Sequence, residues 1–404
     1  MPPTALRPDH ALVLLKGGAE LFPALVEAIG AAQHEVLLET YIFDFSRSVI
    51  PVAEALEQAA ARGVRVRVVV DGVGTGDVPA DWQQRWRSAG LQWQVFNPAQ
   101  GWRVLMPKRW RRLHRKLCVV DRRIAFCGGV NLLDDHYDPN HGTLEQPRFD
   151  FAARVTGPLV EDMHDTMERL WLRLEATRAS MRRSLQGTLQ TARAVARAGV
   201  ETGPRATALD GAVAALVLRD NFRFRRRIEV TYRLALSQAR REVLIANAYF
   251  LPGVQLQRAL LRAARRGVKI TLLLQGRYEY FMQFHASRAV YGMLMAAGIE
   301  IIEYEASFLH AKVAVMDGGL GAVATVGSSN LDPFSLLLAR EANVFVRNDA
   351  FAAELRAHLL TAMQGQGRRV EAQQHANRPV LTRALNWLAY GLMRVALMAT
   401  GKRY

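Results

Sequence analysis

The sequence HRKLCVVD at residues 114–121 returns as HAKVAVMD at residues 310–317. In each copy two small residues, one further residue and an asparagine follow: GGVN ends at Asn131 and GSSN ends at Asn330. The residues between Lys and Asp are apolar in both copies, so each copy is predicted to open a buried β-strand. Side chains two residues apart on a strand point to the same face, so the His and Lys of each copy share a face.

The duplication extends beyond this motif. Three further matches keep the same order and offsets between 204 and 208 residues: EVLL at 35–38 with EVLI at 242–245, ARGVRV at 61–66 with RRGVKI at 265–270, and AGL at 89–91 with AGI at 297–299. The glycines in these matches are typical helix ends, so strands alternate with helices in each half. We therefore predict an α/β fold of two similar α/β/α domains related by a pseudo-twofold axis.

The repeat also sets the expected domain boundaries. Residues 1–174 form the first domain and residues 211–370 the second, each with one copy of the motif. Residues 175–210 have weak periodicity and contain three glycines and a proline, which predicts a connector that is helical around residues 188–198. Residues 371–404 form a separate amphipathic segment.

The composition favours a polyanionic partner. Among 404 residues, Lys and Arg exceed Asp and Glu by 16, and half of the residues are hydrophobic, enough for a sizeable core. Nucleic acid, a phosphate-bearing substrate and an anionic membrane surface all fit this charge. The two cysteines, Cys118 and Cys127, exclude a disulfide-stapled scaffold and are expected to be buried. No window reaches the roughly 18 uninterrupted apolar residues of a spanning helix, so attachment to a membrane would be peripheral.

Two His–Lys pairs suit displacement at a phosphodiester. Histidine serves as nucleophile or proton carrier near neutral pH, and lysine neutralises the non-bridging oxygens as charge builds. Asparagine adds hydrogen-bond donors, and the small residues would let the backbone approach the phosphate. In-line displacement needs an attacking group and a leaving-group acid on opposite sides of phosphorus, which two facing copies provide. We therefore expect one active site in the cleft between the halves.

Two groups of polar residues leave alternatives open. Asp121 and Asp317 either belong to the catalytic machinery or hold the turn after the strand by salt bridges or Asx-type hydrogen bonds. Five residues after the first motif (Asp134, Asp135, His136, Asp138 and His141) match no compact metal-ligand spacing, so a polar loop is the preferred interpretation. With two lysines for the phosphate, neither a metal nor a cofactor is required.

The paired motifs resemble the HKD signatures of the phospholipase D superfamily over nearly the whole chain. Flanking stretches resemble bacterial cardiolipin synthases, most closely those of the B type: ETYIF at 39–43, Asn221 with Arg225 and Arg226, YFLP at 249–252 and REAN at 340–343. The resemblance implies synthesis of cardiolipin from two phosphatidylglycerol molecules, with release of glycerol and a phosphohistidine intermediate. Alternatives are a phospholipase D-type hydrolase, a nuclease of the same superfamily, or a non-catalytic membrane-binding protein.

The same resemblance implies roles for individual residues. One histidine attacks phosphorus and the other protonates the departing alcohol, and we assign these roles to His114 and His310. A carboxylate downstream of each motif is expected to orient its histidine, at the places of Asp150 and Glu341. The remaining expected site residues are Lys116, Asp121, Lys312 and Asp317 for catalysis and Asn131, Asn330 and Ser328 for substrate binding.

The C-terminal segment supports a lipid substrate. Residues 381–400 contain only two charged side chains, Arg383 and Arg394, eleven residues or about three helical turns apart. An interfacial helix with Trp387 near the headgroups is preferred over a core helix. Aromatic residues at 278–284 either line an acyl-chain access or pack internally, and the basic run at 108–112 is expected to capture phosphate or to contact an anionic surface.

The expected partner is therefore an anionic phospholipid membrane that contains phosphatidylglycerol and cardiolipin, on the cytoplasmic side of the cell membrane. Nucleic acid is the less favoured partner because it has no need of the apolar C-terminal segment. Intact His, Lys and Asn in both motifs weigh against a non-catalytic protein. The sequence leaves open the donor lipid, the range of acceptor alcohols and the oligomeric state.

Overall fold

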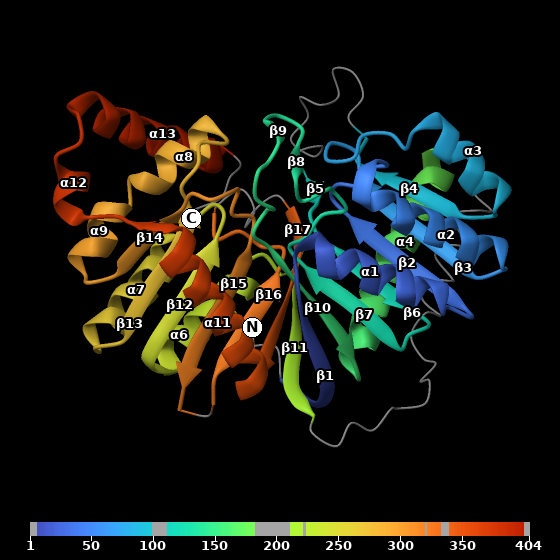
Figure 1. Ribbon diagram of the computed structural model, residues 1–404, viewed down its shortest axis with the longest axis horizontal. Helices are drawn as coiled ribbons and strands as arrows, with labels where there is room; N and C mark the ends of the chain where they lie inside the picture. Colours follow the sequence, from blue (N-terminus) through green and yellow to red (C-terminus); the bar gives the residue numbers. More distant parts are fainter. Residues whose placement is uncertain are drawn as a thin grey trace.

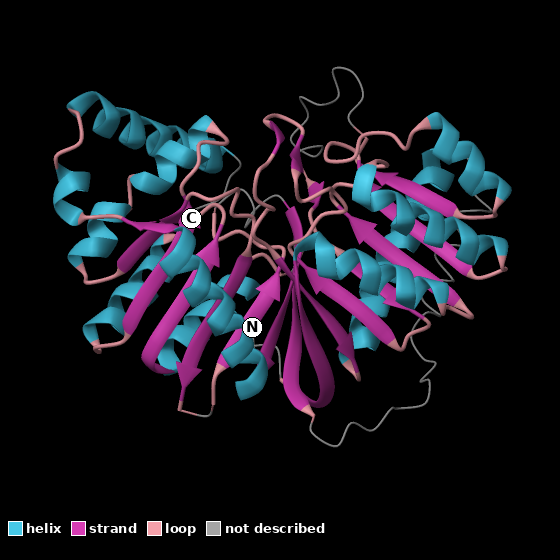
Figure 2. Cartoon of the chain, in the orientation of Figure 1, coloured by secondary structure: helices cyan, strands magenta, loops and turns pink. Residues whose placement is uncertain are grey.

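The computed structural model describes residues 6–98, 111–181, 211–220, 224–319, 321–332 and 339–399 (Figure 1). Within these ranges sixteen strands form one mixed sheet that continues through both halves, with helices along its faces (Figure 2). The observed α/β architecture confirms the predicted fold class.

The first half carries eight strands of this sheet and a small separate hairpin. Its strands are β1 (Arg7–Lys16), β2 (Glu35–Thr40), β3 (Arg65–Asp71), β4 (Gln92–Phe96), β5 (Arg112–Leu113), β6 (Leu117–Val120), β7 (Ile124–Gly128) and β10 (Phe151–Thr156), with the hairpin β8 (Tyr137–Asp138) and β9 (Gly142–Thr143). Its helices are α1 (Gly17–Gly30), the 3-10 helix η1 (Arg47–Val49), α2 (Ile50–Ala61), α3 (Ala80–Ser88) and α4 (Leu159–Met181).

The second half repeats this pattern and adds a C-terminal extension. Its strands are β11 (Ala212–Arg219), β12 (Ala239–Asn247), β13 (Lys269–Gln275), β14 (Glu300–Tyr304), β15 (Lys312–Gly318), β16 (Val323–Gly327), β17 (Ala339–Arg347) and β18 (Gly367–Arg369). Its helices are α6 (Arg227–Gln238), α7 (Val254–Arg265), α8 (Phe281–Arg288), α9 (Tyr291–Ala296), α11 (Asp349–Gln366), α12 (Ala372–Ala376) and α13 (Val380–Ala399).

The strand order is nearly palindromic about the centre of the sheet. It runs β18-β14-β13-β12-β15-β16-β17-β11-β1-β10-β7-β6-β2-β3-β4, with β5 off this path beside β17. Each of the seven first-half strands on the path has a counterpart at the same distance from the β1–β11 pair. This is the order that a pseudo-twofold axis between β1 and β11 produces. The motif strands β6 and β15 are counterparts, and the hairpin after β15 is longer than the hairpin after β6, as the extra residues before Gly327 predict.

Matched glycines end matched helices. Gly63 follows α2 and Gly267 follows α7, with φ of 88° and 86°. A residue with a Cβ is strained in this left-handed conformation, whereas glycine adopts it freely and lets the chain turn into the next strand. The parallel strands β3 and β13 then begin at equivalent places, so their carboxyl ends reach equivalent edges of the sheet.

The two halves share a hydrophobic core. One cluster of buried side chains combines Phe151 and Val155 of β10 with Leu309 and Val344 of the second half, and helices α4 and α11 both contribute to it. Two further clusters lie under α1–α3 in the first half and under α6–α9 in the second. The two predicted α/β halves are therefore joined through one continuous sheet and one shared core.

Two expected boundaries differ from the structure. Helix α4 continues to Met181, so the first seven residues of the predicted connector are part of the first half. The predicted helix at residues 188–198 lies outside the described residues. At the C-terminus, α13 packs on α8, and its Ala389 and Met393 belong to the core of the second half. None of the helices in the described ranges is both long and apolar enough to cross a membrane.

Candidate active site

A cavity of about 500 Å³ opens where the two halves meet, and both motif histidines line it. His114 lies between β5 and β6, and His310 lies just before β15. Because β15 is antiparallel to β12, its first residues lie beside the carboxyl ends of the parallel strands β12 and β13, where ligands bind in open α/β sheets. The structure thus brings both copies of the motif to one cavity.

The main chains of the two halves interlock at the histidines. The backbone N–H of His114 donates to the carbonyl of Arg340, 3.0 Å away, and β5 pairs with β17 in parallel. The backbone N–H of His310 donates to the carbonyl of Phe149, also at 3.0 Å. Each histidine is therefore fixed by hydrogen bonds to the opposite half of the chain.

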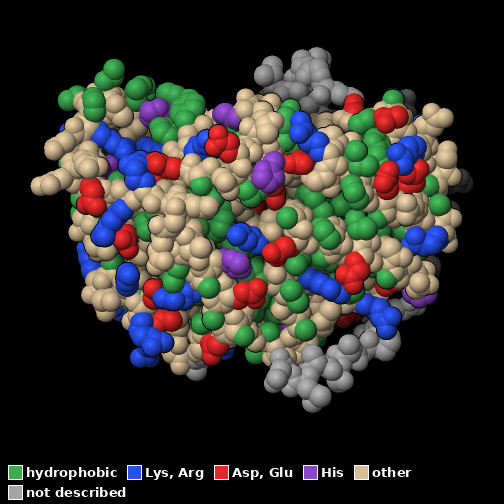
Figure 3. Space-filling view, in the orientation of Figure 1, with side chains coloured by type: hydrophobic (Ala, Val, Ile, Leu, Met, Phe, Trp, Pro, Cys, Tyr) green, Lys and Arg blue, Asp and Glu red, His purple; other side chains and the backbone are tan. Residues whose placement is uncertain are grey.

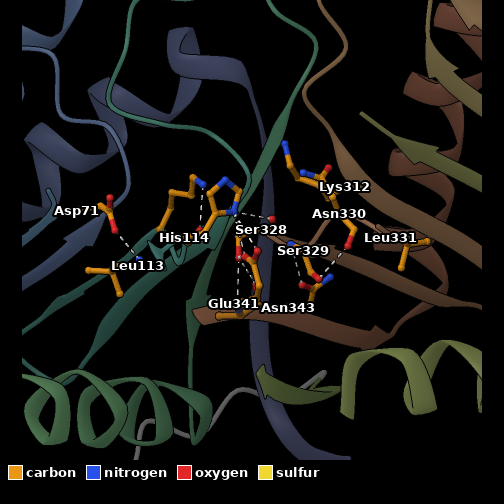
Figure 4. A network of polar contacts seen from close by, with 12 residues as sticks. Asp71, Leu113, His114, Lys312, Ser328, Ser329, Asn330, Leu331, Glu341 and Asn343 are labelled. Carbon is orange, nitrogen blue, oxygen red and sulfur yellow. Dashed lines mark hydrogen bonds and ion pairs between the residues drawn. The ribbon is translucent and has the colours of Figure 1, made fainter. Parts of the chain in front are cut away.

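The histidine side chains are also oriented across the halves. Nδ1 of His114 lies 3.1 Å from the carboxylate of Glu341, and Nδ1 of His310 lies 2.6 Å from that of Asp150 (Figure 4 shows the first pair). The sequence-based expectation that each carboxylate orients the histidine of its own motif is wrong. Asp150 and Glu341 belong to segments beside the β1–β11 centre of the sheet, so they face the other half.

These hydrogen bonds determine which ring nitrogen is available for chemistry. When Nδ1 donates its hydrogen to a carboxylate, Nε2 of a neutral imidazole keeps its lone pair. Burial lowers the pKa of His114, which Glu341 partly opposes, and burial with Lys312 and Lys116 nearby holds the pKa of His310 well below its usual value. Both rings can therefore act as nucleophile or base through Nε2.

The two carboxylates differ in their surroundings. Glu341 accepts hydrogen bonds from His114 and from the Ser328 hydroxyl; burial raises its pKa, but these contacts together with Lys116 bring it below the usual value. Burial raises the pKa of Asp150 to about 7. The His310–Asp150 pair consequently retains a proton near neutral pH more readily than the His114–Glu341 pair.

The two motif lysines are buried beside their histidines. Nζ of Lys116 donates to the carbonyl of His114 at 3.0 Å, and Nζ of Lys312 donates to the carbonyl of His310. Burial lowers the pKa of Lys116 to about 7 and that of Lys312 to about 8. Neither lysine lines the cavity itself, so their charges act on the site from the layer behind the histidines.

Asp121 and Asp317 hold turns at the far ends of the motif strands. The Asp121 carboxylate accepts the backbone N–H groups of residues 33–35, each at 2.8 Å, and Asp317 accepts those of residues 240–242. Asp317 lies five positions after Lys312 on the same strand, a distance of about 16 Å. Neither carboxylate lines the cavity, and both are bound to main-chain N–H groups, which favours the turn-holding interpretation over a catalytic role.

The small residues after each strand make room for the orienting carboxylates. A Cβ on Gly129 would lie 2.3 Å from an oxygen of Asp150, closer than atoms can approach. Ser328 takes the equivalent place in the second half, is fully buried and donates to Glu341. Ser328 is therefore a positioning residue, which corrects its assignment to substrate binding, and the expected approach of this backbone to phosphate is replaced by packing against a carboxylate.

Asn131 and Asn330 both line the cavity, and their role in substrate binding stays a prediction. Asp135 and Asp138 also line it but are bound by protein groups, the N–H of Gly18 and the guanidinium of Arg148. Within the described residues, His, Cys, Asp and Glu side chains form no group of three or more that could hold a metal ion. The polar-loop interpretation of residues 134–141 stays a prediction.

Comparison with known proteins identifies the family of this chain. The family model described as "Cardiolipin synthase, PLD-like domain" matches residues 25–171 and 232–362. Cardiolipin synthase B of Escherichia coli (strain K12) is 37% identical over 353 residues, which are 87% of this chain and 80% of that protein. This chain belongs to the phospholipase D-like cardiolipin synthase family.

This member of the cardiolipin synthase family also matches more distant proteins over most of its length. Cardiolipin synthase A of Erwinia tasmaniensis is 28% identical over 383 residues, covering 94% of this chain and 74% of that protein. The crystal structure of phosphatidylserine synthase from Haemophilus influenzae superposes with a TM-score of 0.64 over 97% of this chain and 95% of the other, at 11% identity. At this identity the likeness shows a shared fold.

Sequence reasoning missed two residues that position the histidines of this family member. The Asp71 carboxylate accepts the backbone N–H of Leu113 at 2.7 Å, and the Gln275 side-chain carbonyl accepts that of Leu309 at 3.0 Å. Asp71 and Gln275 end the matched strands β3 and β13 at the 204-residue offset of the repeat. That shared offset, with a polar residue at the end of a buried strand in both halves, was the available signal.

The structure also places Tyr41, part of the basic run at 108–112 and the two cysteines, all of which the sequence analysis singled out. The ring of Tyr41 lies 4.9 Å from that of His114. Arg112, the last residue of the basic run at 108–112, lines the cavity and lies 3.4 Å from Asp71, while residues 108–110 are outside the described ranges. The two cysteines are buried on neighbouring strands but face opposite sides of the sheet, and burial raises the pKa of each to about 12.

Proposed function

We propose that this enzyme makes cardiolipin by transferring a phosphatidyl group from one phosphatidylglycerol to a hydroxyl of another, with release of glycerol. The observation that carries the proposal is that both motif histidines line one cavity, each oriented by a carboxylate from the opposite half. The relationship to cardiolipin synthase B supports the choice of reaction.

In the first step, Nε2 of His114 attacks phosphorus, and the bond from phosphorus to the oxygen of the headgroup glycerol breaks. The proton held by the His310–Asp150 pair passes to that oxygen, and glycerol leaves. Two observations support this direction: the lowered pKa of Glu341, which keeps a charge beside His114, and the raised pKa of Asp150, which keeps a proton beside His310. Lys116 and Lys312 offset the negative charge that builds on the non-bridging oxygens.

In the second step, His310 accepts the proton of an incoming hydroxyl while the alcohol oxygen attacks phosphorus. The bond from phosphorus to His114 breaks, which releases cardiolipin and restores the free ring. Water in place of the alcohol would give phosphatidic acid, so transfer requires that the cavity hold an alcohol at this point. A phospholipase D-type hydrolase would use the same two histidines and differ only in accepting water instead of an alcohol in the second step.

Mass analysis of lipids formed by the purified protein from phosphatidylglycerol vesicles tests the reaction. We expect cardiolipin and glycerol in equal amounts, and trapping of a phosphatidyl group on His114 in a His310→Ala variant. Phosphatidic acid as the sole product would identify a hydrolase, and cleavage of labelled DNA without cardiolipin would identify a nuclease. Full turnover by the His114→Ala, His310→Ala double variant would refute the catalytic assignment.

We further propose that the enzyme binds peripherally to an anionic membrane on the cytoplasmic side, through a surface formed by α8 and α13. One side of α13 packs inward through Asn386, Ala389 and Met393, with Nδ1 of His285 2.7 Å from the Asn386 side-chain oxygen. Six apolar side chains on the other side of α13 are 51% to 79% exposed: Val380, Leu381, Trp387, Leu388, Leu392 and Val395. The packed side of α13 fits the core-helix alternative, and its exposed apolar side supports the interfacial helix proposed here.

The surroundings of this surface support a lipid partner. Figure 3 shows hydrophobic side chains gathered over α13 and α8. Arg383 and Arg394 are exposed on α13, where they would meet anionic headgroups. Tyr278, Tyr280 and Phe281 are also exposed at the start of α8, and Tyr280 lines the cavity as well. The apolar surface therefore reaches the rim of the active site.

Flotation with vesicles tests the surface. We expect a Trp387→Ser, Leu388→Ser, Leu392→Ser variant to lose most binding to phosphatidylglycerol vesicles while it still turns over a short-chain soluble lipid. Val230→Ser with Leu234→Ser, two exposed apolar residues on α6, is the matched control and should bind as the unchanged protein does. Undiminished binding by the α13 variant would refute this surface.

A further inference from the structure

A tyrosine and a glutamate form a hydrogen-bonded pair on the cavity wall, near His310. Tyr249 follows β12 and Glu279 follows β13, so the two neighbouring parallel strands bring them to the same edge of the sheet. Both side chains line the cavity, and the Tyr249 hydroxyl donates to the Glu279 carboxylate at 2.5 Å. We call these residues the Tyr249–Glu279 pair.

Within the described residues, no cation lies within ion-pair distance of the Glu279 carboxylate. Other carboxylates of the cavity are held by protein groups: Asp150 by His310 and Asp138 by Arg148. Glu279 receives only the Tyr249 hydroxyl, so its second carboxylate oxygen has no hydrogen-bond donor in the described part of the chain. A carboxylate at this place is therefore available to a bound molecule.

The charge of Glu279 is unexpected beside a binding site for phosphate. A carboxylate repels the anionic phosphodiester, and an ionised carboxylate only accepts hydrogen bonds, so the group that it binds must be a donor. Asn330 supplies a second, independent acceptor: it lines the same cavity, is 3% exposed, and its side-chain oxygen has no partner among the described residues. A buried acceptor without a donor, beside a half-buried carboxylate with one oxygen unoccupied, favours a ligand that brings hydroxyl groups.

The first half of the chain has no counterpart of this carboxylate. At the 204-residue offset that relates β3 to β13, Thr75 takes the place of Glu279. The Thr75 hydroxyl donates to the carbonyl of Tyr41 at 3.0 Å and accepts the N–H of Phe43 at 2.9 Å. The Thr75 hydroxyl thus has protein partners both as donor and as acceptor. Asn131 of the first half also lines the cavity with an unpartnered oxygen, as Asn330 does, so within the described residues the two sides differ in the carboxylate of Glu279.

We propose that the Tyr249–Glu279 pair and Asn330 form a subsite for neighbouring hydroxyl groups of a glycerol headgroup. The inference rests on the proposed function, in which glycerol leaves and a glycerol hydroxyl enters on the side of His310. A carboxylate can accept hydrogen bonds from two adjacent hydroxyls, and this holds a polyol with a third oxygen free to react. The subsite selects a polyol over a simple alcohol or water as the acceptor.

Two soluble acceptors that differ by one hydroxyl test this selection. Propylene glycol has a hydroxyl adjacent to its primary alcohol, and n-propanol lacks it, so the ratio of the two phosphatidyl alcohols formed from phosphatidylglycerol vesicles measures the subsite. We expect the unchanged enzyme to prefer propylene glycol at least tenfold in kcat/KM, since sites built for a hydroxyl discriminate strongly against its absence. Glu279→Gln and Glu279→Ala should lower this preference about tenfold, because kcat/KM falls further for propylene glycol than for n-propanol. The ratio isolates the acceptor, since both reactions share the same donor step.

Further variants separate positioning from folding. Tyr249→Phe removes only the hydroxyl that orients Glu279 and should lower the preference less than Glu279→Ala does. Glu354→Gln on the exposed face of α11 is the matched control for loss of a carboxylate and should leave the ratio unchanged. If Glu279→Ala does not fold, as judged by thermal unfolding, Glu279→Gln and Tyr249→Phe carry the test.

The possible outcomes distinguish this inference from the proposed function. An unchanged ratio in the variants, with both alcohol products formed, would overturn the subsite alone. Ethanolamine, used as a third acceptor, would overturn the polyol assignment if Glu279 favoured it over propylene glycol. Failure of the unchanged enzyme to form any phosphatidyl alcohol or cardiolipin would overturn the proposed function itself.

Discussion

At the scale of single residues, the chemistry depends on two buried imidazole–carboxylate hydrogen bonds, and the two are not equivalent. Glu341 keeps a charge beside His114, with help from Ser328, whereas burial favours a proton on Asp150 beside His310. The same pair of residue types is thereby suited to opposite roles, attack on one side and proton donation on the other.

The charge of Glu341 should matter more than its volume. Glu341→Gln keeps the size of the side chain but can donate to Nδ1 of His114, which favours the tautomer with the hydrogen on Nε2 and removes the nucleophilic lone pair. We expect kcat to fall on the order of 10³-fold or more with KM little changed. Quench-flow measurement of the phosphohistidine burst checks this, with Glu354→Gln as control; a normal burst in Glu341→Gln would contradict it.

The buried lysines predict a pH dependence of anion binding. Lys116 and Lys312 have pKa values of about 7 and about 8, so both are charged below pH 7 and lose charge as the pH rises through these values. We expect the affinity for dimethyl phosphate, whose single charge is constant in this range, to fall from pH 6.5 to pH 9. Calorimetric titration at several pH values measures this affinity, and a constant Kd would show that neither lysine titrates in the free enzyme.

At the scale of secondary-structure elements, Asp121 and Asp317 fix the motif strands to their neighbours. Each carboxylate caps the backbone N–H groups that open β2 or β12. Asp317→Ala should therefore lower the free energy of unfolding by about 1–2 kcal/mol while kcat/KM stays within about twofold. Urea unfolding together with vesicle assays tests both expectations. A large loss of kcat/KM in a fully folded Asp317→Ala variant would return this residue to the catalytic set.

The sequence predicted local elements better than contacts between them. The apolar runs after Lys116 and Lys312 form strands, and Gly63 and Gly267 end helices, because these features depend on neighbouring residues. The pairing of His114 with Glu341 could not be read in the same way, because it depends on the position of β17 in the sheet. The sequence likewise did not show which face of α13 packs on the protein, because the partner helix α8 lies about a hundred residues earlier in the chain.

At the scale of the whole molecule, one sheet and one shared core join the halves. The β1–β11 pairing connects strands with no motif of their own, which is why the repeat suggested separate domains. Phe151 is fully buried in the shared core, so Phe151→Ala should cost about 3–5 kcal/mol. We expect scanning calorimetry to show one transition that shifts as a unit. Two transitions, with one unaffected by Phe151→Ala, would show that the halves unfold independently.

The crossed pairing of histidines and carboxylates has a consequence for how this gene can change. A change at Asp150 lies in the stretch encoding the first motif, yet it removes the hydrogen-bond partner of the histidine in the second motif. A chimera that joins one half of this chain to the other half of a distant relative inherits each imidazole from one parent and its companion acid from the other. Such a chimera is functional only where each histidine still fits the carboxylate from the other parent. Changes around one motif therefore constrain changes around the other.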